Sequence, residues 1–176
     1  FPAKILPGGY VMGGINRPNI EDQRLVQEDW DGNIVWEFNK FEQIYSKHPI
    51  DKEIPGEEPI WSARQHHDYQ REGNPVGYYT PGMEPLVDKG NRMVLARKYR
   101  KDPEISDKLL SNDTIYEVTW DGKIVWEWHC NDHFDEFGFS EAAKNAIYRN
   151  PNWREDLQMG DWMHTNSISS LGPNKW

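Results

Sequence analysis

The stretch DWDGNIVWEF, residues 29–38, is repeated almost letter for letter as TWDGKIVWEW at residues 119–128. Both copies contain a tryptophan, the pair Asp-Gly and the run Ile-Val-Trp-Glu in the same order. Repetition at this level is the sequence signature of a fold assembled from copies of one unit. The chain of 176 residues is therefore predicted to be built from repeated units.

Each copy predicts a β-hairpin. In the second copy, residues 114–120 are rich in β-branched and aromatic residues, and residues 124–128 alternate bulky side chains on one face. Asp121 and Gly122 lie between these two runs. They are typical of a tight turn, because glycine adopts the positive φ that such turns often require.

Further candidate strands lie upstream of each hairpin. Residues 64–70 and 91–99 precede the second hairpin, which gives four consecutive strands in antiparallel order. Residues 9–15 and 22–29 fill equivalent places in the first unit, whose initial strand is missing or cryptic. Residues 162–169 are predicted to form the first strand of yet another unit. Four-stranded antiparallel sheets repeated along a chain are typical of a β-propeller.

The predicted fold class is therefore all-β, a β-propeller of four-stranded antiparallel blades, with residues 1–176 forming part of one propeller domain. The predicted blades are an incomplete first blade at residues 1–39, a second blade at residues 64–129 and the start of a third blade at residues 162–176. Two long connections, residues 40–63 and 130–161, join them. In the second connection Ser140 is predicted to cap a helix that ends near Arg149, because Asn150 is followed by proline.

The number of predicted blades leads to an expectation about partners. The chain supplies roughly two blades and the first strand of a third, whereas a closed propeller has ~4 to 8 blades. Sheets without neighbours would expose strand edges and apolar faces. We therefore expect another polypeptide chain to complete the propeller by supplying its C-terminal part.

The composition excludes several classes of protein. Lys and Arg number 20 against 29 Asp and Glu, and without a basic cluster this balance argues against a nucleic-acid partner. No apolar run is long enough to span a membrane, and residues 1–9 lack the pattern of a signal peptide. Cys130 is the single cysteine, so no disulfide can form within this chain.

Two histidine-bearing stretches are the first candidates for a site: QHHDYQ at residues 65–70 and DWMHTNSI at residues 161–168. Both fall on the predicted first strand of a unit, the strand that lines the central channel of a propeller. We therefore expect His67 and His164 to face a common funnel, with Asn166 pointing the same way as His164 and His66 pointing away from His67. The alternative is that backbone carbonyls satisfy these rings and that they merely fill the channel wall.

A second polar cluster is HCNDHFDEF, residues 129–137. It is rich in potential metal ligands but matches no spacing that a particular metal requires. A solvated acidic loop is the favoured interpretation, and no metal site is assigned. The tryptophans of the two hairpins are expected to pack between blades.

The ordered combination of motifs resembles the bacterial-type arylsulfate sulfotransferases, which transfer sulfuryl groups between phenols without a nucleotide sulfate donor. The motifs are the DG-x-IVWE hairpins, HHD at 66–68, NRMVLARKY at 91–99, DTIYEVTWDGKIVWEW at 113–128 and DWMHTNSI at 161–168. The resemblance implies a six-bladed propeller with a histidine-lined central site, no cofactor, and a periplasmic or secreted location. It also implies that His67 and His164 are catalytic, and that Asn166, His66 and Asp68 contact substrate.

The implied reaction moves a sulfuryl group from a phenolic sulfate ester to a phenol. A neutral imidazole can attack the sulfur, and a second phenol can intercept the resulting sulfohistidine, which divides the transfer into two easier steps. Aimed donors must hold the sulfuryl oxygens while another group protonates the departing phenolate. In the family, the sulfated histidine and an arginine that clamps the sulfuryl group lie after the DWxHxN strand, so this chain is expected to hold at most half of the site.

Two other functions remain open at this stage. The same channel histidines could bind a metal ion in a propeller enzyme of another kind. A non-catalytic propeller used for recognition or scaffolding is the third interpretation, since a fold does not determine a function.

Overall fold

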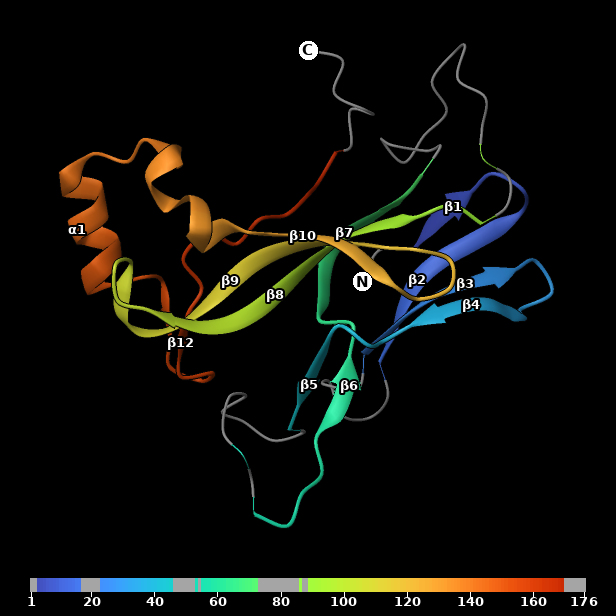
Figure 1. The fold of residues 1–176 in the computed structure, drawn as a ribbon, viewed down its shortest axis with the longest axis horizontal. Coiled ribbons are helices and arrows are strands. Elements are labelled where there is room, and N and C mark those ends of the chain that lie inside the picture. The colour runs from blue at the N-terminus through green and yellow to red at the C-terminus, as the bar shows by residue number, and fades with distance from the viewer. Residues whose placement is uncertain are drawn as a thin grey trace.

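The computed structural model describes residues 3–16, 23–45, 53, 55–72, 86 and 89–169. Within these residues the chain is mostly β, with antiparallel sheets and two short helices. Two larger sheets lie next to one another, a small two-stranded ribbon projects from between them, and both helices lie at the far end (Figure 1). The all-β class is confirmed, whereas the closed propeller and its number of blades stay predictions.

The first sheet is a four-stranded antiparallel meander. Its strands, in spatial and sequence order, are β1 (Lys4–Leu6), β2 (Tyr10–Asn16), β3 (Gln23–Asp29) and β4 (Ile34–Phe38). The initial strand that the sequence reading left missing or cryptic is therefore present as β1. Gly8 and Gly9 both adopt positive φ and reverse the chain between β1 and β2. A strand of three residues is too short to show alternation, which is why the pattern did not reveal it.

The second sheet contains the other repeat. Four of its six strands are β7 (Gln65–Arg71), β8 (Arg92–Asp102), β9 (Ser106–Val118) and β10 (Ile124–His129), and each of these pairs antiparallel with the next. All four lie where the sequence predicts strands. The β8–β9 hairpin is longer than predicted, because pairing continues from Arg92↔Val118 out to a tight turn after Asp102.

The repeated letters encode the same turn twice. Gly32 and Gly122 adopt φ of 83° and 81°, and their amides donate to the carbonyls of Asp29 and Thr119 at 3.1 and 3.0 Å. The side-chain oxygen of Asp29 or Thr119 then accepts the amide of the residue four positions on, at 2.9 and 3.0 Å. Each hairpin therefore closes with the backbone and side-chain bonds that its own letters supply.

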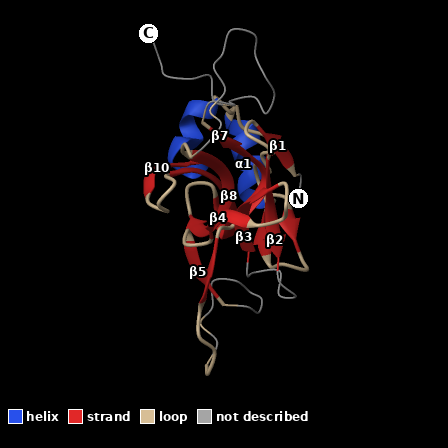
Figure 2. Ribbon diagram, turned by 90° about the vertical axis from the view of Figure 1, so that its right-hand side faces the viewer, coloured by secondary structure: helices blue, strands red, loops and turns tan. Residues whose placement is uncertain are grey.

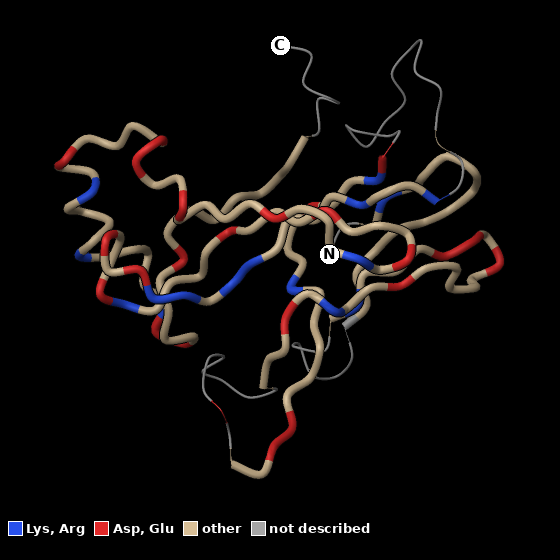
Figure 3. The backbone as a smooth tube through the Cα atoms, in the orientation of Figure 1, with Lys and Arg blue, Asp and Glu red and all other residues tan. Residues whose placement is uncertain are grey.

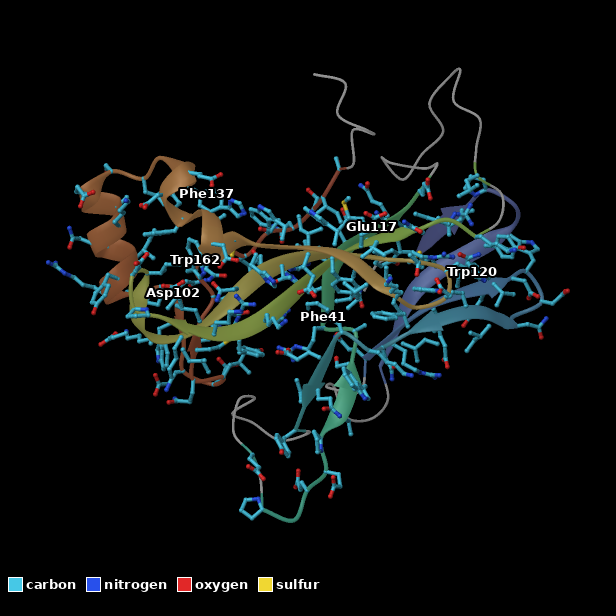
Figure 4. The ribbon with its side chains drawn as sticks, in the orientation of Figure 1. Phe41, Asp102, Glu117, Trp120, Phe137 and Trp162 are labelled. Atoms are coloured by element: carbon cyan, nitrogen blue, oxygen red, sulfur yellow. The ribbon has the colours of Figure 1, made fainter. Side chains whose placement is uncertain are left out.

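The two sheets pack through the repeat tryptophans and one buried arginine. The Arg92 guanidinium lies 4.3 Å from the ring of Trp36 and 4.7 Å from that of Trp120, and the Trp36 indole N–H donates to the Trp120 carbonyl at 2.9 Å. Trp120 lies on the side of the second sheet that faces the first (Figure 4). Around them lies a shared apolar core: Leu6, Met12, Leu25, Phe38, Phe41, Ala63, Tyr69, Val94, Ala96, Tyr116 and Val118.

Not every hairpin tryptophan packs in this way, which corrects the sequence reading. Trp30 is 73% exposed and Trp126 is 44% exposed. Trp30 adjoins the turn rather than the sheet interior, and Trp126 lies at a register shift on β10. The first copy has the same register shift next to Trp36, so the shift does not explain the difference. Trp36 and Trp120 pack in the core shared by the two sheets, whereas Trp30 and Trp126 lie outside it.

The long connections carry the remaining elements. Residues 40–63 contribute the ribbon of β5 (Glu42–Ile44) and β6 (Ile60–Ser62). Residues 130–161 contribute a 3-10 helix η1 (Cys130–Phe137), the helix α1 (Glu141–Arg149), β11 (Trp153–Arg154) and β12 (Met159–Gly160). The predicted helix is confirmed, with the Ser140 hydroxyl accepting the Ala143 amide at its start. No helix among the described residues is long and apolar enough to cross a membrane.

The helices pack at one end of the molecule, beside the tip of the β8–β9 hairpin (Figures 1 and 2). A second core joins them to the sheet, and its buried members are Ile105, Leu110 and Phe134. Trp162 contacts this core, with its ring centroid 5.5 Å from that of Phe134, and it lies close to Phe137 (Figure 4). The connection therefore reaches the segment that carries the DWMHTN motif.

Residues 162–169 differ from their prediction, because they form no strand. The segment is extended, but its amides at Thr165 and Ile168 donate to the side chains of Asp113 and Asp68 rather than to a neighbouring strand. Side-chain acceptors replace the backbone ladder here. The rest of the predicted start of the third blade, residues 170–176, lies outside the described residues.

Replacing Trp36 by alanine should lower the free energy of unfolding by about 3–5 kcal/mol, because the change empties the contact between the two sheets. Trp30→Ala is the matched control, and it should change the free energy by less than about 0.5 kcal/mol because Trp30 is exposed. Urea unfolding monitored by circular dichroism checks both values. Equal effects of the two substitutions would show that Trp36 does not join the sheets.

Candidate functional site

Two histidines from distant parts of the chain meet at the surface of the second sheet. His67 lies on β7 and His164 lies on the extended segment after β12, 97 residues later. Their Nε2 atoms are 3.1 Å apart, and the rings meet edge to face with centroids 5.0 Å apart. Both side chains are exposed to solvent. The two residues that the sequence places on a common funnel are thus in direct contact.

Both histidines adopt a backbone conformation that is unusual for residues with a side chain. The φ angle is 54° at His67 and 52° at His164, in the left-handed region. Each such residue costs about 1–2 kcal/mol relative to the right-handed region, so the surrounding structure has to hold it in place. At His67 the cause is an irregularity on β7, where the pairing with β8 shifts between Gln65 and Tyr69. Backbone strain of this kind clusters at functional sites.

Asp161 fixes the orientation of the His164 ring. Its Oδ2 atom lies 2.6 Å from Nδ1 of His164, and the Asp161 side chain is almost completely buried. Because a carboxylate can only accept, Nδ1 carries a proton, and the Nε2 atom of the neutral ring keeps its lone pair. The single proton between the two Nε2 atoms is then donated by His67 when both rings are neutral.

Several causes hold the pKa of His67 below its usual value. Burial contributes most, followed by the neighbouring rings of His66 and His164 and the positive charge of Arg97, while Asp113 acts in the opposite direction. A lowered pKa favours the neutral imidazole. His67 therefore stays neutral further into the acidic range than a free histidine does.

A buried carboxylate connects β7 to the segment that carries His164. Asp113 on β9 is 2% exposed, and its Oδ1 atom lies 3.0 Å from Nε2 of His66. Its Oδ2 atom accepts the Thr165 amide at 2.6 Å. Burial raises the pKa of Asp113, but the hydrogen bonds from His66 and Thr165 outweigh it and hold the pKa below its usual value. The carboxylate is therefore charged and fully engaged in holding the site together.

Asp68 fastens the same segment a few residues further on. Its Oδ2 atom accepts the Ile168 amide at 2.9 Å, and its Oδ1 atom forms an ion pair with Lys4 of β1. The sequence reading assigned Asp68 and His66 to substrate contact. The structure buries both side chains and bonds them to protein groups. The expectation that His66 points away from His67 is wrong, because the centroids of the two rings are 5.2 Å apart. Only His67 of the HHD motif reaches the surface.

Asn166 is exposed two residues after His164. The expectation that both side chains point the same way used strand alternation. That argument does not hold here, because the segment forms no strand and His164 is left-handed. The Asn166 amide makes no hydrogen bond with the part of the chain that the structure describes, which leaves it available to a ligand.

Sequence reasoning missed Asp161 and Asp113. Asp161 had a usable signal, since it precedes His164 by three residues in the quoted motif. Asp113 had none, because it reaches its partners only after β7, β9 and the segment of residues 161–168 come together.

The ligand-rich stretch of residues 129–137 folds as η1 and the end of β10. His133 bonds Glu136 at 2.9 Å and stacks on Trp128, and His129 lies 3.0 Å from the Thr114 hydroxyl. Burial raises the pKa of the Cys130 thiol to about 12. Throughout the described ranges no three His, Cys, Asp or Glu side chains are grouped so that they could hold a metal ion.

Fold and site together define an all-β protein in which strained, solvent-facing histidines are held by buried carboxylates. A sequence profile of the arylsulfotransferase (ASST) family matches residues 83–175, more than half of the chain, and the chain belongs to this family. The match confirms the resemblance drawn from the motifs, and it includes Asp113, Asp161 and His164, whereas His67 precedes it. No curated protein and no solved structure matches the chain.

Asp113→Asn should remove a pH-dependent part of the stability. Because the folded-state pKa of Asp113 is depressed, its contribution is fully present above the unfolded value of about 3.9 and is lost as the pH falls through the lower folded value. Urea unfolding at a series of pH values should show a smaller decrease on acidification for this variant than for the wild type.

Asp132→Asn is the control for this prediction, since it removes the same charge from an exposed side chain. Its unfolding should follow the wild-type pH dependence. In the Asp113→Asn protein, hydrogen exchange of the Thr165 amide should also accelerate, because its acceptor is weakened. An acid profile and an exchange rate that match the wild type would contradict the role of Asp113.

Proposed function

We propose that this protein is an arylsulfate sulfotransferase that moves a sulfuryl group from a phenolic sulfate ester to a phenol through a histidine intermediate, with His67 and His164 in its active site. Membership of the arylsulfotransferase family supports the class of enzyme. The single observation that carries the assignment of the site is the contact between the Nε2 atoms of His67 and His164, with Asp161 bonded to the far nitrogen of His164.

The proposed reaction has two balanced halves. In the first, an imidazole nitrogen forms a bond to sulfur, the bond between sulfur and the aryl oxygen breaks, and the departing phenolate takes up a proton. In the second, the oxygen of the acceptor phenol attacks the sulfur, gives up its proton, and the nitrogen–sulfur bond breaks. Each half needs one proton donor or acceptor within hydrogen-bond reach of a phenolic oxygen.

The histidine pair meets this need. In the neutral pair one ring presents an N–H and the other a lone pair at the same point. Once the pair has taken up one further proton it can protonate a leaving phenolate, and the neutral pair that remains can receive the proton of the acceptor phenol. The family resemblance assigns the histidine that becomes sulfated to a position after the DWxHxN segment. On that assignment His67 and His164 act as proton donors and as contacts to the sulfuryl oxygens.

The strained backbone supports the same proposal. Donors that stabilise developing negative charge have to be aimed before the reaction begins. The left-handed conformations of His67 and His164, and the carboxylates of Asp113 and Asp161, fix where the two imidazoles lie. The fold therefore tolerates an unfavourable backbone conformation at two residues, and this conformation positions the two imidazole rings.

Metal binding is the second candidate, and two observations favour it. Two imidazole nitrogens bound to one zinc ion at ~2.0–2.1 Å lie roughly 3.3 Å apart in a tetrahedral site, close to the 3.1 Å between His67 and His164. A carboxylate behind a ligating histidine, as Asp161 lies behind His164, is also typical of metal sites. Elemental analysis and activity after chelation separate the two, since the sulfotransferase proposal expects turnover to survive chelation.

The complete assembly is proposed on the family resemblance. A six-bladed propeller completed by another polypeptide chain, and a periplasmic or secreted location, fit an enzyme that acts on phenolic esters. Mass spectrometry of the native particle would count its chains. A single species with the mass of one closed propeller chain would overturn the proposed second chain without affecting the reaction.

His164→Ala, His164→Asn and His67→Ala should each reduce turnover of a nitrophenyl or methylumbelliferyl sulfate by roughly 100-fold or more, because each removes a proton-transfer group or its partner. The release of nitrophenol or methylumbelliferone, with phenol as the acceptor, gives the rate. Circular dichroism confirms that each variant is folded. His133→Ala is the matched control, since His133 lies on η1, where it bonds Glu136 and stacks on Trp128. Full activity of the His164 variants would end the proposal.

A further inference from the structure

Several basic residues lie along β8 (Figure 3). Lys98 and Arg100 have acidic partners within the protein, since Lys98 pairs with Glu127 at 3.8 Å and Arg100 with Asp132 at 3.9 Å. Arg97 directly precedes Lys98 in the sequence, but alternation along the strand places its side chain on the opposite face of the sheet from Lys98 and Arg100.

The register of the sheet identifies that face. Arg97 on β8 pairs directly with Asp113 on β9, and directly opposed residues in an antiparallel pair project from the same face. Asp113 uses that face to reach His66 and the Thr165 amide. Arg97 therefore stands on the side of the sheet where His67 and His164 meet. Consistent with this, the positive charge of Arg97 is one of the causes that lower the pKa of His67, after burial and the charges of His66 and His164.

The guanidinium of Arg97 has no counter-charge in the described part of the chain. Asp113 lies opposite Arg97 in the strand pair, but its two oxygens bond His66 and the Thr165 amide. The main chain of Arg97 is nevertheless fixed: its amide donates to the Arg64 carbonyl at 3.2 Å, and its own carbonyl accepts from Nε of Arg64 at 3.4 Å. Arg64 in turn has a partner in Glu42, at 3.3 Å.

A half-buried cation beside two solvent-facing imidazoles is suited to a bound anion. Removing an ion from water is costly unless an opposite charge compensates it. A guanidinium also presents its donors in a planar fork that matches two oxygens of one oxyanion. The neutral state of His67 leaves Arg97 as the fixed positive charge at this point of the site.

We propose that Arg97 forms, together with His67 and His164, an oxyanion subsite that holds the sulfuryl oxygens of the aryl sulfate. This inference rests on the proposed function for the identity of the oxyanion. The resemblance expects an arginine clamp after the DWxHxN segment, so Arg97 is an additional cation on the β-sheet side of the sulfuryl group. It binds the substrate's non-bridging oxygens, and the histidines keep their proton-transfer role.

The test compares Arg97→Gln with Arg100→Gln, which removes the same group from the opposite face of the same strand. Arg97→Gln should lower kcat/KM for nitrophenyl sulfate by about 10- to 100-fold, because a charged donor to the developing negative charge is lost. Arg100→Gln should stay within about twofold of the wild type. Arg97→Lys keeps the positive charge but not the planar, forked arrangement of donors, so its decrease in kcat/KM should be intermediate.

A second measurement does not depend on turnover. Inorganic sulfate is titrated into the full chain while the imidazole signals of His67 are followed by NMR. Sulfate should bind to the wild type and bind roughly tenfold or more weakly to Arg97→Gln. In the same variant the titration midpoint of His67 should rise, since a nearby positive charge has been removed. A merely structural role of Arg97 would not move that midpoint selectively.

The outcomes separate this inference from the proposed function. Aryl sulfate turnover that Arg97→Gln leaves unchanged would overturn the subsite and leave the function standing. Sulfate binding that depends on Arg97, in a protein that turns over no aryl sulfate, would keep the subsite and overturn the function. If Arg97→Gln does not fold, Arg97→Lys decides, and wild-type sulfate affinity in that variant overturns the subsite.

Discussion

The carboxylate of Asp113 is the interaction on which the site depends. It lies at the centre of the second sheet and bonds a histidine of β7 with one oxygen and the backbone of residues 161–168 with the other. Without it, the segment that carries His164 would have no bond to β9 at Thr165. One buried charge thus attaches residues 161–168 to the second sheet, and this segment supplies His164 to the histidine pair.

The energetics of this arrangement are those of a strained site held by charged hydrogen bonds. The left-handed residues His67 and His164 each cost about 1–2 kcal/mol. Hydrogen bonds to charged groups contribute about 1.5–3 kcal/mol each, and Asp113 and Asp68 both accept from backbone amides of the segment. The carboxylates therefore offset the strain. The same groups are buried beneath the imidazoles, so they stabilise the position of the pair without competing for the ligand.

Local patterns in the sequence predicted what is local in the structure. The Asp-Gly turns, the strands next to them and the cap at Ser140 depend on a few adjacent letters, and they are found where those letters stand. The sequence also predicted that His67 and His164 lie together, and their side chains are in contact. The details failed where a long-range contact replaced the regular pattern. The left-handed backbone at His67 interrupts the alternation along β7, so the ring of His66 lies beside that of His67 instead of pointing away from it. Side-chain acceptors replaced the ladder along residues 162–169.

The aromatic contact of Trp162 links the helical insertion to the chemistry. Trp162 stands between Asp161 and His164 in the chain, its indole N–H donates to Asn112 at 2.9 Å, and its ring packs on Phe134 of η1. The position of the insertion therefore affects the position of the segment that carries His164. Exchanging residues 130–160 for those of a relative would therefore also change the position of His164. The insertion and residues 161–168 have to be exchanged together if the histidine pair is to keep its geometry.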